Sequence, residues 1–147
     1  MAVRPIVLTY DPKKVILTVG GVPVSGYTDG TFIQVEPNSA TFTKSVGADG
    51  EVVRSKSNDN THTITITLQQ SSLSNDHLSI LADADKKSNA GMVPVSIKDA
   101  NGTSNMFWAQ CWVETDPTWN YDKVHQERTW SIHTGQQTGA HYGGIPI

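Results

Sequence analysis

Hydrophobic and polar residues alternate most regularly in residues 61–69, where Ile64, Ile66 and Leu68 occupy even positions and threonines occupy the odd positions 61, 63, 65 and 67. Successive side chains of a strand point to opposite faces, so this stretch predicts a strand with one apolar and one hydroxyl-lined face. Threonine suits the second face because it is both β-branched and polar. Residues 40–46, 106–115 and 124–134 show the same alternation.

A helix is expected directly after this strand, over about residues 74–90. Its apolar stripe consists of Leu78, Ile80, Leu81 and Ala84. Ser74 is the expected N-cap, and Gly91 is the expected left-handed residue beyond the C-terminus. One such helix can cover part of one sheet.

Short strands separated by turns are expected in the rest of the chain. Their expected ranges are 15–19, 22–27, 32–36, 40–46, 52–54, 93–98, 106–115 and 124–134. This pattern predicts a mainly β fold, an antiparallel β-sandwich or barrel with one flanking α-helix. We expect a single domain over residues 1–147, with extended N- and C-terminal arms and a long loop near residues 47–60.

Composition narrows the classes of function. The formal net charge is -3, which argues against a protein that binds nucleic acid by gripping phosphates. Cys111 is the only cysteine, so no internal disulfide is expected, and its aromatic neighbours predict a buried structural thiol in a reducing compartment. The chain contains no run of about 18 apolar residues, so we expect a soluble protein with no membrane anchor and no cleaved signal.

The chain lacks a convincing catalytic motif. His125-Gln126-Glu127 matches half of a zinc deaminase signature, but the required cysteine pair is missing. Residues 99–102 are interpreted as a hairpin turn and not as a calcium loop. No phosphate loop or Gly-x-Ser-x-Gly sequence occurs. We therefore expect no enzyme, no metal and no cofactor.

The four tryptophans raise the possibility of a carbohydrate-binding site in place of a catalytic one. Trp108 and Trp112 share strand parity and would form part of a sugar-stacking platform if both were exposed, whereas packing in a core or a subunit interface is the favoured interpretation. A carbohydrate- or receptor-binding β-domain therefore stays open as an alternative function.

Taken together, the elements resemble the tail tube proteins of contractile-tailed bacteriophages. The most similar part is Gly47-Ala48-Asp49-Gly50-Glu51-Val52-Val53-Arg54-Ser55, followed by Thr63-Ile64-Thr65-Ile66-Thr67-Leu68 and the helix. The resemblance implies a virion protein that assembles in the host cytoplasm, with six copies in each ring and rings stacked into a hollow tube. It implies contacts with itself and with sheath, tape-measure, baseplate and tail-terminator proteins, while DNA passes without specific binding. The type VI secretion tube protein has a similar fold and is a second alternative.

The polar faces of the expected strands are then candidates for the wall of the channel, joined from six subunits into one inner barrel. The expected lumen-facing residues are Thr41, Thr43, Ser45, Thr61, Thr63, Thr65, Thr67, Gln110, Glu114, Thr129 and Ser131. The resemblance also implies that the long loop reaches the next ring. Its expected contact residues are Asp49, Glu51, Arg54, Lys56, Asn58 and Asp59.

Overall fold

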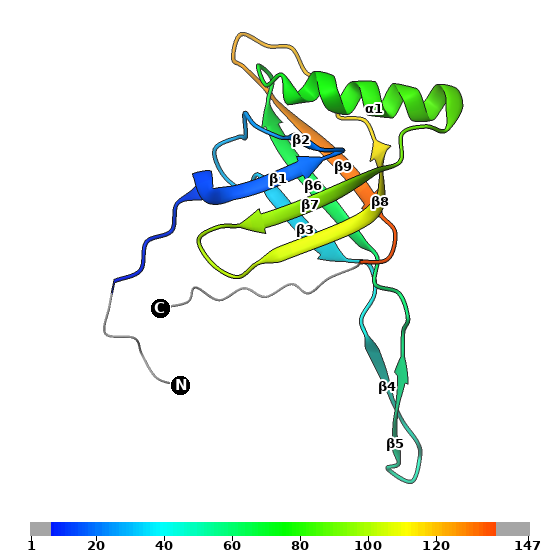
Figure 1. The fold of residues 1–147 in the computed structure, drawn as a ribbon. Coiled ribbons are helices and arrows are strands. Elements are labelled where there is room, and N and C mark those ends of the chain that lie inside the picture. The colour runs from blue at the N-terminus through cyan, green and yellow to red at the C-terminus, as the bar shows by residue number, and fades with distance from the viewer. Residues whose placement is uncertain (1–6, 138–147) are drawn as a thin grey trace.

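The fold was analysed in a computed structural model, which describes residues 7–137 (Figure 1). Most of the expected arms, residues 1–6 and 138–147, lies outside the described residues. The elements are the 3-10 turn η1 (Pro12–Lys14), β1 (Val15–Val19), β2 (Val22–Pro23), β3 (Ile33–Pro37), β4 (Phe42–Val46), β5 (Val52–Lys56), β6 (His62–Gln69), α1 (Ser74–Ser88), β7 (Val93–Asp99), β8 (Asn105–Thr115) and β9 (Glu127–Thr134).

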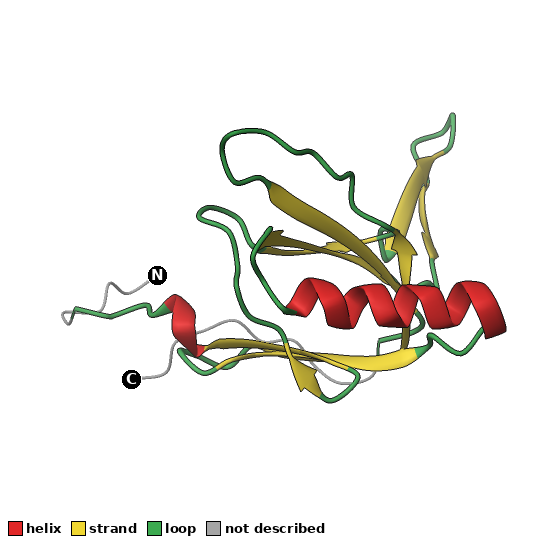
Figure 2. Cartoon of the chain, turned by 90° about the horizontal axis from the view of Figure 1, so that it is seen from above, coloured by secondary structure: helices red, strands yellow, loops and turns green. Residues whose placement is uncertain are grey.

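Seven strands form one antiparallel sheet in the order β2-β1-β7-β8-β9-β6-β3, and β4 and β5 form a separate hairpin. The sheet folds over, so that the half containing β1 and β7 lies across from the half containing β9, β6 and β3 (Figure 2). The predicted class, a mainly β antiparallel fold with a single flanking helix, is confirmed.

The core lies between the two halves of the sheet. It is built from alternate residues of the strands: Leu17, Val19, Val95, Ile97, Ile64, Ile66, Leu68, Trp130 and Ile132, together with Trp108 and Cys111 of β8. The even positions of β6 all point inward and are fully buried, as their alternation predicted. Burial of these side chains is the main stabilising contribution to the fold.

Helix α1 runs across one end of the folded sheet (Figure 1). Leu78 and Ala82 are its buried apolar residues, and Leu81 packs partly against the core. Two polar contacts fix its orientation. His77 Nε2 lies 2.9 Å from the Val19 carbonyl oxygen, and the Trp130 indole donates to Asn75 Oδ1 at 2.9 Å.

Three details predicted for the helix are wrong. Ser74 is the first helical residue and not the N-cap, because its hydroxyl accepts a hydrogen bond from the Ser25 backbone N–H at 3.0 Å. The helix ends at Ser88, and Asn89 adopts the left-handed conformation (φ 56°) that was assigned to Gly91. Ile80 is 67% exposed, since only the Leu78–Ala82 side of the helix faces the sheet.

An irregularity in β8 changes which tryptophan is buried. Val95 pairs with Trp108 and Val93 pairs with Cys111, so β8 carries one extra residue there, a β-bulge. Trp108 and Cys111 therefore both point into the core, and Phe107 points outward. Packing in the core, the favoured interpretation, is confirmed for Trp108, whereas Trp112 lies on the opposite side of β8, so these two residues do not form a sugar-binding platform.

The strand expected over residues 124–134 begins only at Glu127. Residues 116–126 form the connection from β8 to β9, which we call the β8–β9 loop. Within the described residues, no helix has both the length and the apolar character needed to cross a membrane.

Candidate functional site

One side of the sheet is polar along three neighbouring strands and the second half of a fourth. The register places Thr65 opposite both Gln34 of β3 and Ser131 of β9, and Thr67 opposite Thr129, so these side chains share one surface. We call this surface the polar face. Its members are Gln34, Glu36, Thr63, Thr65, Thr67, Gln110, Trp112, Glu114, Thr115, Glu127, Thr129, Ser131 and His133.

The polar face is acidic. Glu36, Glu114 and Glu127 are its carboxylates, and no Lys or Arg of β3, β6, β9 or the second half of β8 points to it in the described structure. Arg128 of β9 lies on the opposite, core-facing side and is 5% exposed. Such a surface offers a phosphate group hydroxyls and negative charge, and these strands add no cation to it.

At both edges of this surface, the outer strand has no second strand partner among residues 7–137. On β3, the Phe32 carbonyl accepts from the Thr67 N–H at 3.0 Å, and the Asn38 N–H donates to the Thr61 carbonyl at 3.1 Å. The backbone groups of even-numbered residues therefore face β6, and those of Val35 face away from the sheet. The second half of β8 likewise pairs only with β9 in the described chain.

The predicted lumen residues fall into two groups. Those that lie on the polar face are Thr63, Thr65, Thr67, Gln110, Glu114, Thr129 and Ser131. The others lie elsewhere: Thr43 and Ser45 belong to the hairpin strand β4, and Thr41 and Thr61 lie where the hairpin joins the sheet. Gln34 and Glu36 of β3 were missed, although the alternation of Ile33 and Val35 with these polar residues was visible in the sequence.

The second feature is the hairpin of β4 and β5, which projects from the body at the end away from α1 (Figure 1). All residues of both strands are exposed. The prediction of a long loop over residues 47–60 is therefore only partly right, because β5 occupies Val52–Lys56. Asp49 and Glu51 lie in the turn, Arg54 and Lys56 on β5, and Asn58 and Asp59 in the segment that leads to β6.

The two faces of this hairpin differ chemically. Phe42 pairs with Lys56, Lys44 with Arg54, and Val46 with Val52, so these six side chains share one face, which we call the cationic face. The Arg54 guanidinium lies 4.2 Å from the centre of the Phe42 ring. The opposite face carries Thr43, Ser45, Val53 and Ser55 and has no charge.

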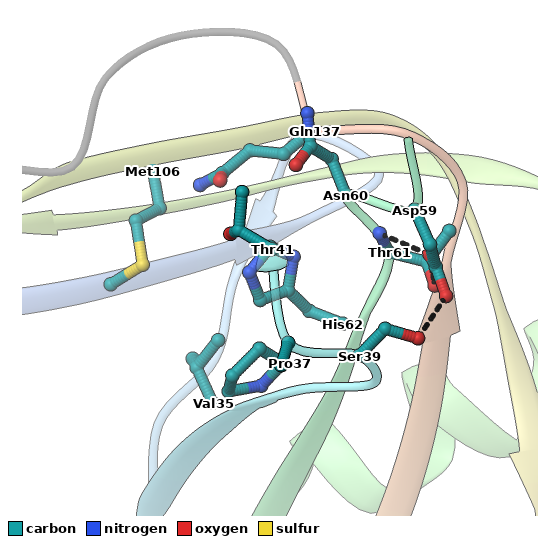
Figure 3. Close-up of a pocket in the computed structure, with 11 residues that line it drawn as sticks. Val35, Pro37, Ser39, Thr41, Asp59, Asn60, Thr61, His62, Met106 and Gln137 are labelled. Carbon is teal, nitrogen blue, oxygen red and sulfur yellow. Dashed lines mark hydrogen bonds between the residues drawn. The ribbon is translucent and has the colours of Figure 1, made fainter. Parts of the chain in front are cut away.

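A set of hydrogen bonds ties the base of the hairpin to the body (Figure 3). The Asp59 carboxylate accepts from the Ser39 hydroxyl at 2.7 Å and from the Thr61 N–H at 2.9 Å, and the Thr61 hydroxyl also donates to it. These hydrogen bonds stabilise the ionised carboxylate and so lower the pKa of Asp59. The bond from the Thr61 hydroxyl makes the largest contribution. The Asn38 amide donates to Thr61 Oγ1 at 2.9 Å. We call this set the joint.

A pocket of about 430 Å³ lies beside the joint and is lined by residues that include Val35, His62, Met106 and Gln137 (Figure 3). The Trp108 indole donates to His62 Nδ1 at 3.2 Å, so this histidine has a structural role. Among residues 7–137, no group of three or more His, Cys, Asp or Glu side chains is placed to hold a metal ion.

The residues considered for chemistry have structural partners. His125 Nε2 accepts from the Ser71 N–H at 3.0 Å, and Glu127 accepts from the Thr28 hydroxyl. Cys111 is buried as predicted, and its burial raises the pKa of the thiol to about 12. A thiol with this pKa is not ionised near neutral pH, which makes it a poor nucleophile.

Comparisons with known proteins agree with this geometry. Solved structures similar in fold include the cap that terminates the tube of the anti-feeding prophage (TM-score 0.64, 10% identity, 93% of this chain and 94% of that one). Two further similar chains come from the extracellular contractile injection system PVC. One is from its sheath/tube terminator (TM-score 0.60, 8% identity, 90% and 97% covered), and one from its sheath-tube complex (TM-score 0.57, 10% identity, 88% and 90% covered).

Comparisons of the sequence with known proteins identify the family to which the chain belongs. The curated protein "Structural protein ORF10" of Pseudomonas phage KPP10 is 29% identical over 147 residues, which cover 95% of this chain and 85% of that protein. The family model described as "Bacteriophage PhiTE tail tube protein" matches residues 11–139, which include every strand and the helix. The chain therefore belongs to the bacteriophage PhiTE tail tube protein family, a family of structural phage proteins.

Proposed function

We propose that this protein polymerises as stacked hexameric rings and forms the hollow inner tail tube through which phage DNA is delivered into the host. The observation that carries the proposal is the polar face, which presents hydroxyls and carboxylates and no Lys or Arg from its four strands. Its β6 threonines, Thr63, Thr65 and Thr67, are half-buried within one subunit although they are polar. These are the properties expected of a wall that DNA must slide along.

Ring closure follows from the open edges. The outward backbone groups of Val35 on β3 are available to pair with the free second half of β8 in a neighbouring subunit. Six such junctions would join the polar faces into a closed inner barrel. Closure would also remove the exposed strand edges, which in a free subunit invite uncontrolled aggregation.

An acidic, hydroxyl-lined barrel suits passage of DNA. A wall rich in Lys or Arg would bind phosphates with release of counterions and retain the genome. The polar face avoids this retention while the few carboxylates keep the DNA from settling on the wall. In the virion the tube would contact sheath, tape-measure, baseplate and tail-terminator proteins, after assembly in the host cytoplasm.

Negative-stain electron microscopy of the purified protein tests the proposal. We expect rings with sixfold symmetry and hollow tubes that lengthen with protein concentration. A protein that stays monomeric or trimeric at all concentrations, and binds glycans, would instead indicate a receptor-binding domain of the tail tip. Single rings that never stack would indicate a terminator, the role named for two of the fold relatives. A type VI secretion tube would assemble equally well but would carry protein effectors and not DNA.

A further inference from the structure

We propose that residues 138–147, which follow the last described residue, bind back along the first half of β8 and fill a groove between β8 and β3. The occupant of the groove is thus the C-terminal segment of the same chain, which binds by adding a strand to β8. The inference does not depend on the tube function, because it concerns how a single subunit is completed.

Each edge of β8 is paired along only one half within residues 7–137. Its first half pairs with β7 on one edge, and its second half pairs with β9 on the other. The Asp99 N–H donates to the Ser104 carbonyl at 3.0 Å, in register with the β7–β8 pairs. Because backbone groups of a strand alternate between its two edges, those of Asn105 and Phe107 face away from β7. No strand of the described chain pairs with these two residues on that edge.

The described chain beyond β9 already enters this edge. β9 ends at Thr134. The Gly135 N–H then donates to the Gln110 carbonyl at 2.7 Å, and Gln137 forms an isolated antiparallel bridge with Trp108. Each step forward along this segment is one step back along β8, as in the β8–β9 pairs, so the register of β9 continues without a shift. The chain at Gln137 therefore runs toward the free part of the β8 edge.

The same register assigns the side chains of the next residues. Directly opposed residues of an antiparallel pair point to the same face. Trp108 points into the core, and the Gln137 amide Nε2 opposite it is buried without a hydrogen-bond partner. In this placement Gly139 lies opposite Met106 on the core side, and Ala140 lies on the outer side. A glycine at the core-facing position lets the backbone approach the Met106 side chain closely.

The groove on the core side is open and has apolar walls. The pocket of about 430 Å³ beside the joint adjoins a second pocket of about 340 Å³, since Val35 and Met106 line both. Gln137 and Val35 line opposite sides of the first pocket (Figure 3). Val35 and Met106 pack against the core but are only half-buried. A segment that covers them removes apolar surface from water, which stabilises the subunit.

The C-terminal segment has the length and the side chains to fill this groove. Residues 138–142 span roughly 17 Å when extended, whereas β8 from Trp108 back to Asn105 spans only about 10 Å. Tyr142 and Ile145 supply an aromatic ring and a branched apolar side chain for the second pocket. Residues 138–147 include no Asp, Glu, Lys or Arg, so burial of the segment removes no charged side chain from water.

This placement divides β8 between two partners. The C-terminal segment of the same chain completes the first half of the strand. The second half keeps its other edge available for β3 of a neighbouring subunit. Ring closure then uses subunits whose grooves are already filled.

Disulfide trapping tests the placement directly. In a Cys111→Ala background, Met106→Cys with Gly139→Cys puts two thiols at directly opposed positions, where the Cα separation of an antiparallel pair suits a disulfide. Oxidation of the dilute full-length protein with oxidised glutathione should give an intramolecular disulfide, seen as a faster-migrating monomer on a non-reducing gel. The matched control, Met106→Cys with Ala140→Cys, directs the second thiol to the outer face and should be trapped at least about tenfold less.

Three results would overturn the placement. Equal trapping of the two pairs would show that the segment is not held in this register, and trapping of neither would show that it does not lie on β8. Covalent dimers in place of monomers would show that the segment of a second copy fills the groove. Tubes formed by the same variants would leave the proposed function standing, so the two failures are distinguishable.

Hydrogen exchange of the full-length chain gives an independent readout. The N–H groups of Asn105 and Phe107 should be protected, because each faces the added strand. Ala140→Pro removes a backbone N–H that faces β8, so protection of Asn105 should fall at least about tenfold, whereas Met106, whose N–H faces β7, should not change. The control Ala140→Gly keeps this N–H and should retain the protection. Fast exchange of Asn105 and Phe107 in the unmodified protein would overturn the inference.

Discussion

Lysine substitutions on the polar face give the sharpest functional prediction. We consider Thr63→Lys, Thr67→Lys and Ser131→Lys, three positions that share this face and are not directly paired with one another. The face carries the three carboxylates Glu36, Glu114 and Glu127, so the substitutions bring its formal charge from -3 to 0 in each subunit. None of the three side chains is in the core, and the subunit should fold normally.

The size of the effect follows from the dimensions of the strands. Six subunits would place about 18 new lysines in each ring. A ring no taller than the 8-residue strand β6, roughly 26 Å, surrounds about 15 DNA phosphates, because duplex DNA has one charge per ~1.7 Å. The lysines match the phosphates in number and also cancel the wall's own carboxylates, so repulsion of the DNA is lost and individual Lys–phosphate contacts should slow the DNA in a salt-dependent way.

The assay is DNA release from phage that carry the variant protein, with tails counted by electron microscopy. We expect tails in normal number, DNA release slowed by at least about tenfold at low salt, and partial recovery as salt is raised. Gln at the same three positions is the matched control and should leave release unchanged. Normal release from intact lysine-bearing tails at low salt would refute the assignment of this face to the channel.

Three further predictions concern the edge, the joint and the thiol. Val35→Pro removes a backbone N–H that faces away from β6, so it should prevent ring closure in sedimentation experiments while Val35→Ala, which keeps the N–H, still forms rings. The pKa of Asp59 is lowered in the folded protein, so its stabilising effect on the joint is present at neutral pH and is lost as the pH falls from about 3.8 through the lower folded value. The protection factors of residues 57–61, which compare the measured exchange rate with the intrinsic rate at each pH, should therefore fall in acid, and they should be low at every pH in Asp59→Asn; unchanged protection in this variant would show that the carboxylate does not hold the joint. Cys111 should resist a thiol reagent at pH 8 until the protein unfolds, and fast labelling of the native protein would contradict its raised pKa.

Local periodicity was sufficient to predict the fold class. The inward set Ile64, Ile66 and Leu68 followed directly from the alternation in residues 61–69, since a strand buried on one face must repeat every two residues. The helix was placed within two residues of its true end. Its buried stripe was less predictable, because which side of a helix is covered depends on the sheet beneath it, and Ile80 is exposed for that reason.

Features that depend on contacts between distant segments could not be predicted from the pattern of residues along the chain. One extra residue in β8 reverses the orientation of Trp108 relative to simple alternation, and a bulge leaves no distinct local signal. Thr43 and Thr65 both alternate with apolar residues, yet they lie in different sheets, because strand partners are chosen in three dimensions. The register that brings Glu36 beside Thr63 completes the acidic face, and it too was invisible in the sequence.

The most direct test of the central claim is a cryo-electron microscopy reconstruction of tubes grown from the purified protein. We expect a closed barrel around the axis in which Thr65, Thr129 and Ser131 face the channel and β3 of one subunit pairs with β8 of the next. A reconstruction in which these side chains face outward, with the channel lined by other elements, would contradict it.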